Sequence, residues 1–262
     1  MKKRKIKWRN IIMFVLITIC ISLIVYSGIK IIDWFMSNKR NHEIKEQIND
    51  YIKINEIEPE TETNVDVKKE KYEINWNQLK EKNPDTVAYL KVNNTNIDYI
   101  VVKGQDNSYY LNHNFNKEYN ISGWVFTDYR NKIDSNDKNL VVFAHDTKDG
   151  SMFGSLKNIL KENWYTNKDN QVIDFVTEDG LLRYQVFSVY KINNEDYYIN
   201  VIFLENEFSD FVNTIKSRSI YNFNVDVAEN DNILTLSTCS DGGLKRIVLH
   251  AKLIKENDQL SE

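Results

Sequence analysis

Short runs of β-branched and aromatic residues, separated by polar turns, fill the chain from about residue 72 onward. Such runs are typical of β-strands when Asn, Asp or Gly residues bound them. We expect strands at Thr86–Val92, Ile97–Val102, Gly123–Thr127, Leu140–Ala144, Val172–Val176, Leu182–Lys191, Ile233–Thr238 and Ile247–Ile254. About eight strands with few helices predict a mainly β fold that closes, or nearly closes, into a β-barrel.

Helical patterns are few in this region. Asn75–Pro84 predicts a short helix that ends before the proline, because the residue preceding a proline disfavours helical geometry. Phe153–Leu160 predicts a second helix. Asn206–Ser217 predicts a third, whose apolar residues fall on one face: Phe208, Phe211, Val212 and Ile215.

The beginning of the chain has a different pattern, in which basic residues precede a long apolar run from Asn10 to Ile29. Ile11–Ile29 has a helical length of about 28 Å, close to the roughly 30 Å hydrocarbon core of a bilayer. We therefore expect a cytoplasmic basic tail over residues 1–10 and a single transmembrane anchor over residues 11–32, with the remaining chain outside the cell. A cleaved signal peptide and a buried soluble helix are the alternatives, but no small-x-small cleavage site follows cleanly and the run has no polar face.

Residues 33–71 predict a helical stalk and a linker. Apolar residues at Ile44, Ile48, Tyr51 and Ile52 have helical spacing, which indicates a helix from Asp33 to about Ile57. Residues 58–71 are acidic and then basic, with few large apolar side chains, and predict the linker. The globular domain is expected over residues 72–262.

Charge excludes one class of function. The net charge is −4, but residues 1–32 hold seven of the 34 Lys and Arg and none of the 38 Asp and Glu. The remaining 27 basic residues therefore face all 38 acidic ones, a net charge of −11. Nucleic-acid binding depends largely on phosphate neutralisation by Lys and Arg, so we expect no nucleic-acid partner.

Two cysteines occur, Cys20 in the apolar run and Cys239 at the end of a predicted strand, so a disulfide between them is geometrically unreasonable. A single unpaired thiol outside the cell invites a functional explanation. Strand ends that lead into polar loops are places where folds present reactive groups, and a thiolate is a strong nucleophile near neutral pH. We expect Cys239 to be a nucleophile, with a buried structural cysteine as the alternative.

Other residues could complete a cysteine acyl-transfer site. His145 directly follows the strand Leu140–Ala144 and can shuttle a proton between the thiol and a leaving amine. Arg246 could stabilise the oxyanion or hold the substrate carbonyl, although an ordinary surface arginine is the simpler interpretation. Weaker candidates, for substrate binding, are Ser237, Thr238 and Asp146. There is no CxxC, HExxH or Walker motif, and we expect no metal and no cofactor.

Three segments resemble the sortases, the membrane-anchored cysteine transpeptidases of Gram-positive bacteria, and most of all class B. Thr235-Leu-Ser-Thr-Cys239 resembles the TLxTC strand end of that family. Lys148-Asp-Gly-Ser-Met-Phe-Gly154 resembles the class B loop after the catalytic histidine, and Asp106–Phe115 also matches class B. The agreement extends from about Trp76 to Ile254.

The resemblance implies an eight-stranded sortase-type barrel with an N-terminal helical extension, in which Asn206–Ser217 would be the class B insertion. Cys239 would cleave a Thr–Gly-type bond in a C-terminal sorting signal through an acyl-enzyme. The acyl group would then pass to an amine of a peptidoglycan precursor or, as a second option, to a pilin lysine. His145 would be the acid and base, and Arg246 the stabiliser of the oxyanion or substrate.

The chain departs from the class B pattern at Asp146, where Asn is common, and at Thr147, where Met is common. A carboxylate beside the histidine would favour its protonated form, and we expect Asp146→Asn to shift the pH–rate profile. The seven-residue spacing from Cys239 to Arg246 is short for the family. Two other functions fit the sequence: a hydrolytic cysteine protease of surface proteins, and a non-catalytic scaffold tethered to the membrane.

Overall fold

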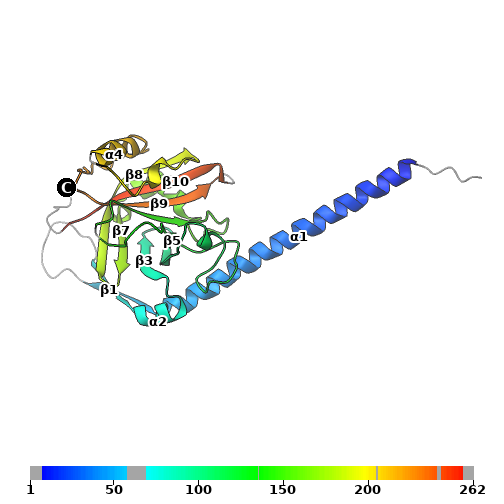
Figure 1. The fold of residues 1–262 in the computed structure, drawn as a ribbon, viewed down its shortest axis with the longest axis horizontal. Helices are drawn as coiled ribbons and strands as arrows, with labels where there is room; N and C mark the ends of the chain where they lie inside the picture. The colour runs from blue at the N-terminus through cyan, green and yellow to red at the C-terminus, as the bar shows by residue number, and fades with distance from the viewer. Residues whose placement is uncertain (1–7, 58–68, 135, 205, 241–242, 256–262) are drawn as a thin grey trace, which may run out of the picture.

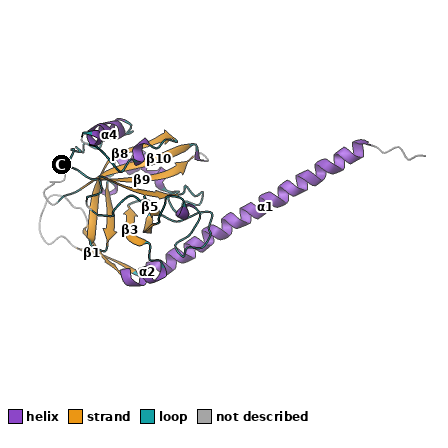
Figure 2. Ribbon diagram, in the orientation of Figure 1, coloured by secondary structure: helices purple, strands orange, loops and turns teal. Residues whose placement is uncertain are grey.

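A computed structural model describes residues 8–57, 69–134, 136–204, 206–240 and 243–255, with only the backbone described at 56, 57, 69–71, 239 and 240. A closed barrel of eight strands forms the body of the protein, as predicted, and a single long helix extends from it (Figures 1 and 2). In chain order the barrel strands are β3 (Thr86–Val92), β4 (Asp98–Lys103), β5 (Phe126–Thr127), β6 (Asn139–Ala144), β7 (Val172–Thr177), β8 (Gly180–Asn193), β9 (Ile233–Ser240) and β10 (Lys245–Leu253).

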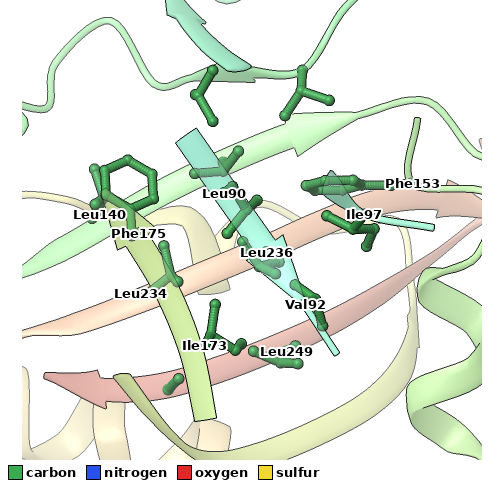
Figure 3. Packing of buried hydrophobic residues seen from close by; sticks show 14 of the residues in the cluster. Leu90, Val92, Ile97, Leu140, Phe153, Ile173, Phe175, Leu234, Leu236 and Leu249 are labelled. Carbon is green, nitrogen blue, oxygen red and sulfur yellow. The ribbon is translucent and has the colours of Figure 1, made fainter. Parts of the chain in front are cut away.

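The strand order around the barrel is β10-β8-β7-β3-β4-β5-β6-β9. Most neighbours are antiparallel, but β4 and β5 are parallel, and so are β6 and β9. Inward-facing side chains of all sides meet in one apolar core, which Figure 3 shows from close by. Burial of these aliphatic and aromatic side chains is the main source of stability, at about 25 cal/mol per Å² of apolar surface.

The N-terminal region combines a helix with a small sheet. Helix α1 (Trp8–Asn49) is, among the described residues, the one helix long and apolar enough to cross a membrane. Its last third packs on the barrel through a stripe of buried residues, namely Asn38, Asn41, Ile44 and Ile48. The chain then forms β1 (Ile52–Ile57), which pairs in antiparallel fashion with β2 (Lys69–Ile74).

This sheet corrects the predicted stalk. The helix ends at Asn49, and Ile52–Ile57 form a strand instead of continuing it. Residues 69–71 belong to β2 rather than to a linker. The expected domain boundary at Tyr72 therefore falls inside β2. Most of the predicted linker, residues 58–68, lies outside the described residues, as does most of the basic tail.

Helices α2 (Trp76–Lys82) and α4 (Glu207–Ser217) confirm two of the predicted helices. Asn75 caps α2 by accepting a hydrogen bond from the Gln78 amide, and all four expected apolar residues of α4 are buried. The helix predicted at Phe153–Leu160 is wrong in part, because only Leu156–Leu160 (η2) is helical, and it is a 3₁₀-helix. The remaining short helices are η1 (Tyr109–Leu111), α3 (Glu162–Tyr165), η3 (Lys168–Asn170) and η4 (Tyr197–Ile199).

The predicted strand Gly123–Thr127 is shortened to its last two residues, Phe126 and Thr127. Gly123 has a φ of +56°, which interrupts extended geometry. The Trp124 amide donates to the Tyr110 carbonyl of η1 rather than to a strand. These three residues, 123–125, thus connect a loop to the barrel instead of extending β5.

Candidate active site

Strands β6 and β9 bring His145 and Cys239 to the same end of the barrel. The two strands are parallel, and Ala144 lies beside Thr238 in their register. His145 follows Ala144 and Cys239 follows Thr238, so both come at the carboxyl ends of strands that lie about 4.8 Å apart. The Thr238 hydroxyl donates to the Ala144 carbonyl at 2.7 Å and ties the two ends together.

Arg246 comes to this end from the opposite direction. It lies directly across from Cys239 in the antiparallel pairing of β9 and β10, whereas Lys245 lies across from Ser240. Opposite positions of such a pair share a face of the sheet, so Arg246, not Lys245, is placed on the Cys239 face. The Arg246 guanidinium turns back toward the strand connection, where Nη1 donates to the carbonyls of Gly243 (2.9 Å) and Lys245 (3.2 Å).

The backbone register is thus what joins the three predicted catalytic residues, while the side chain of Cys239 lies outside the described part of the structure. His145, Cys239 and Arg246 lie on the adjacent strand ends of β6, β9 and β10. In Figure 1 these ends of β9 and β10 lie on the side of the barrel toward which α1 leaves.

The imidazole of His145 has a partner that the sequence did not predict. Its Nε2 lies 2.6 Å from the carbonyl oxygen of Leu111. Because a carbonyl oxygen only accepts hydrogen bonds, Nε2 must carry a proton in this contact. The other nitrogen, Nδ1, is then the one that can accept a proton from a thiol. A backbone carbonyl leaves no signal in side-chain patterns, which is why sequence analysis missed it.

Leu111 belongs to the segment Asp106–Phe115, and side-chain hydrogen bonds shape this segment. Asp106 Oδ1 accepts from the amides of Ser108 (2.7 Å) and Tyr109 (2.8 Å) and from the Ser108 hydroxyl. These hydrogen bonds, that of the Ser108 hydroxyl above all, hold the pKa of Asp106 below its usual range. Asn107 Nδ2 donates to Asp128 Oδ2 at 2.8 Å and so fixes the segment to the end of β5.

Asp128 links this segment to the connection between β8 and α4. Its carboxylate is fully buried and pairs with the Arg130 guanidinium at 2.7 and 2.8 Å. Burial would raise the pKa of Asp128, but the hydrogen bonds from Arg130 and Asn107 outweigh it and hold that pKa below its usual range. Arg130 Nη2 also donates to the Ile199 carbonyl of η4 at 3.2 Å.

Comparison with known proteins decides the family. The family model "Sortase domain" matches residues 90–254 of the chain. The chain belongs to the sortase family. Two curated relatives are both named Sortase B. That of Listeria monocytogenes is 38% identical over 182 residues, or 67% of this chain and 72% of the relative. That of Staphylococcus aureus is 35% identical over 184 residues, or 69% and 75%.

Solved structures agree with the class. Sortase B of Clostridium perfringens matches with a TM-score of 0.64 and 36% identity, covering 68% of this chain and 99% of that one. Sortase B of B. anthracis in complex with AAEK1 matches with a TM-score of 0.70 and 32% identity, covering 85% and 100%. This sortase is therefore most like class B, whose members are cysteine transpeptidases, and sortases are cell-surface enzymes.

The weaker site candidates of this sortase are engaged inside the protein. Ser237 is buried, and its hydroxyl lies 2.9 Å from the Tyr198 hydroxyl of η4. Thr238 is buried and bonded to Ala144. Asp146 is half-buried and forms an isolated β-bridge with Met152, which closes the loop after the histidine. Roles for these three residues in substrate binding stay predictions.

Gly154 has a structural reason for its place in the motif. A Cβ on this residue would lie 2.2 Å from the Thr147 carbonyl oxygen, so the loop closes tightly only with glycine. The Phe153 amide donates to the His145 carbonyl at 3.0 Å from the same turn. The Lys148–Gly154 motif of this sortase therefore fixes the backbone of its histidine.

Buried polar side chains of β6, β8, β9 and β10 are linked by hydrogen bonds that the sequence did not reveal. His250 is fully buried. The Tyr190 hydroxyl lies 2.8 Å from its Nε2, and Thr235 Oγ1 lies 2.8 Å from its Nδ1. Thr235 in turn donates to Asn139 Oδ1, so Nδ1–H donates to Thr235 and Nε2 accepts from Tyr190. Burial lowers the pKa of His250 to about 3, with a further contribution from Arg218.

Among the described residues, metal ligands do not gather at this site. Within the described ranges, no group of three or more His, Cys, Asp and Glu side chains could hold a metal ion. The expectation that this sortase works without metal or cofactor stays a prediction.

Proposed function

We propose that Cys239 is the nucleophile of this transpeptidase and cleaves a sorting signal at a Thr–Gly-type bond. The thiolate sulfur attacks the threonine carbonyl carbon, and a C–S bond forms as the C–N bond to glycine breaks. The proton of the thiol passes to His145 and then to the leaving amine. An acceptor amine then attacks the thioester carbonyl carbon, and a new amide bond forms as the C–S bond breaks. The proton that the amine loses passes through His145 to the departing thiolate and restores the thiol.

One observation supports these roles above all others. The parallel pairing of β6 with β9 puts His145 and Cys239 at one end of the barrel, and β10 adds Arg246 across from Cys239. His145 precedes both Cys239 and Arg246 by more than 90 positions in the sequence, yet the three residues occupy neighbouring backbone positions. A cysteine with a nearby base and a cation is the arrangement that acyl transfer requires.

The contacts of His145 and Arg246 support separate tasks for these two side chains. His145 Nε2 is held by the Leu111 carbonyl, which leaves Nδ1 for the proton transfer. The Arg246 guanidinium now contacts Gly243 and Lys245 carbonyls, which are weak partners for a full charge compared with an oxyanion. Arg246 exchanges these contacts for the substrate oxygen during the reaction.

Membership of the sortase family supports the proposed substrate and location. One related structure is a Staphylococcus aureus sortase B–substrate complex, which supports a peptide substrate of the sorting-signal type here. A peptidoglycan-precursor amine is the proposed acceptor. Helix α1, with its long apolar span, would hold the enzyme in the membrane, with the N-terminus in the cytoplasm and the barrel outside.

Mass spectrometry of the full chain in detergent micelles tests the proposal. The enzyme is incubated with quenched sorting-signal peptides, with and without an added amine, beside Cys239→Ala. We expect a thioester on Cys239, cleavage after Thr, and transfer to the amine. Arg246→Ala should lower kcat about 10²-fold to 10³-fold, as loss of an oxyanion donor does.

Other outcomes have defined meanings. Cleavage without transfer at any amine concentration would favour the hydrolytic protease. A full-activity Cys239→Ala variant would overturn the proposed nucleophile. If no peptide forms an adduct and Cys239 also resists alkylation, the scaffold function becomes the better account.

A further inference from the structure

The docked part of α1 contacts the barrel with amides as well as with apolar side chains. Asn41 is only 2% exposed, and Asn120, which it faces, is 1% exposed. Asn120 Nδ2 donates to Asn41 Oδ1 at 2.9 Å and lies 2.9 Å from the Ser37 carbonyl of the same helix. Buried amides are costly unless they are paired, so this contact fixes the helix and the turn in one relative position.

Asn41 also reaches the backbone of that turn. Its Nδ2 donates to the Gly123 carbonyl at 3.0 Å. Asn120 Oδ1 accepts from the Ser122 amide at 2.9 Å, and the Gly123 amide donates to the Asn120 carbonyl at 3.0 Å. The turn 120–123 is therefore shaped from inside by Asn120 and held from outside by Asn41.

The turn 120–123 also supports the backbone of η1. The Trp124 amide donates to the Tyr110 carbonyl at 3.0 Å, and the Asn120 amide donates to the Asn112 carbonyl at 2.9 Å. Gly123 lies so close that a Cβ there would be 2.8 Å from the Leu111 carbonyl oxygen. The Leu111 carbonyl thus has the turn on one side and His145 Nε2, 2.6 Å away, as its hydrogen-bond partner.

We propose that Asn41 of α1 is a positioning residue for His145, acting through the turn 120–123 and the Leu111 carbonyl. This inference rests on the proposed role of His145 as acid and base. Loosening the turn lets the Leu111 carbonyl move, so the ring loses the partner that fixes its Nε2–H form and its orientation. The helix that leaves the barrel toward the proposed membrane anchor is in this way part of the support of the active site.

Steady-state kinetics of the full chain in detergent micelles test the inference, with Asn41→Ala against Ile48→Ala. Ile48 is a matched control, since it is buried on the same face of α1 but makes an apolar contact. We expect Asn41→Ala to lower kcat about fivefold, the equivalent of one hydrogen bond, with KM changed less than about twofold. Ile48→Ala should lower the unfolding midpoint and leave kcat within about twofold of the parent.

Two further readouts separate positioning from loss of stability. Nuclear magnetic resonance of labelled histidine should show His145 ring signals that move in Asn41→Ala and stay in place in Ile48→Ala. Asn41→Ala and Asn120→Ala together should cost about as much kcat as either alone, because both act on one turn. If Asn41→Ala does not fold, Asn41→Ser replaces it in these experiments, because the side chain of serine is small and polar.

The inference is overturned if the Asn41 variant keeps the kcat of Ile48→Ala and its His145 signals do not move. His145→Ala in the parent chain distinguishes this from failure of the proposed function. If His145→Ala retains activity, the role of His145 is wrong and the inference goes with it. If His145→Ala is inactive while Asn41→Ala matches the control, only the inference is wrong.

Discussion

Helices α1 and α4 both pack on the barrel of this sortase, and their contacts differ in kind. Helix α4 packs through four apolar side chains, Phe208, Phe211, Val212 and Ile215. Helix α1 packs through Asn38 and Asn41 nearest the apolar span and through Ile44 and Ile48 further along. Apolar contacts stabilise without direction, whereas paired buried amides fix one relative position. The comparison assigns stability chiefly to the α4 contact and positioning to the α1 contact.

The largest effect is expected where the α4 contact is broken. Phe208 is fully buried and packs against the Phe203 ring at 5.2 Å between centroids. Phe208→Ala should lower the free energy of unfolding by about 3–5 kcal/mol, because it removes a large apolar side chain and leaves a cavity. Urea denaturation of the full chain measures this, with Phe208→Leu as the milder control. A loss below about 1 kcal/mol would contradict the role given to α4.

Acid should also destabilise the contact between α4 and the barrel, because the titratable side chain of His250 lies there. The Phe211 ring of α4 is 6.5 Å from the ring of His250. The pKa of His250 is about 3 in the folded protein, below its ordinary value of 6.5. The unfolded chain therefore binds an extra proton below about pH 6.5. Stability from this group is complete above that pH and falls by about 2 kcal/mol at pH 5.

Denaturation curves between pH 5 and 8 check this prediction against His250→Gln, which cannot titrate. The variant should be less stable at pH 7 but should depend less on pH. Parallel curves for the two proteins would show that His250 is not the group responsible.

A smaller effect is expected at the polar end of the α1 contact. Asn38 accepts a hydrogen bond from the buried Ser122 hydroxyl. Asn38→Ala should cost about 1–2 kcal/mol, because Ser122 then loses its partner. Adding Ser122→Ala should recover part of that loss, since no buried hydroxyl is left unpaired. A double-mutant cycle by thermal unfolding measures the coupling, and simple additivity would show that the pair does not interact.

The smallest effect concerns the exposed rim of the same contact. Arg40 and Glu118 form an ion pair at 3.7 Å with both side chains about half exposed. Exposed pairs contribute little, so Arg40→Ala should change the free energy of unfolding by less than about 0.5 kcal/mol. A larger change in unfolding experiments would mean that charge, and not the buried amides, holds α1 to the turn.

Sequence patterns predicted the barrel well because its strands are local runs of β-branched and aromatic residues. They failed at Ile52, whose spacing from Ile44 and Ile48 fits a helix. The chain forms a strand there because β2, a non-local partner, pairs with it. Helical and extended periodicities overlap for so few residues, and only the pairing decides between them.

The candidate site was predictable in its parts but not in its assembly. The positions of Cys239 and His145 at strand ends follow from sequence, whereas their adjacency depends on the parallel pairing of β6 with β9. The Leu111 carbonyl and the amide of Asn41 act through tertiary contacts across 34 to 82 residues of chain. Residue patterns carry no record of such contacts.

Under the proposed anchoring, the unbroken helix α1 would set the distance between the membrane and the barrel of this sortase. From Ile32, the end of the proposed membrane span, to Asn38, the first buried residue, the helix rises only about 9 Å. The barrel would therefore lie close to the bilayer surface. The end of the barrel that carries the candidate site would face the side from which α1 comes (Figure 1). Under the proposed anchoring, the distance from the membrane would decide which peptides the enzyme can cleave. A sorting signal close to the membrane would be accessible to the candidate site, whereas the same peptide further out in the wall would not.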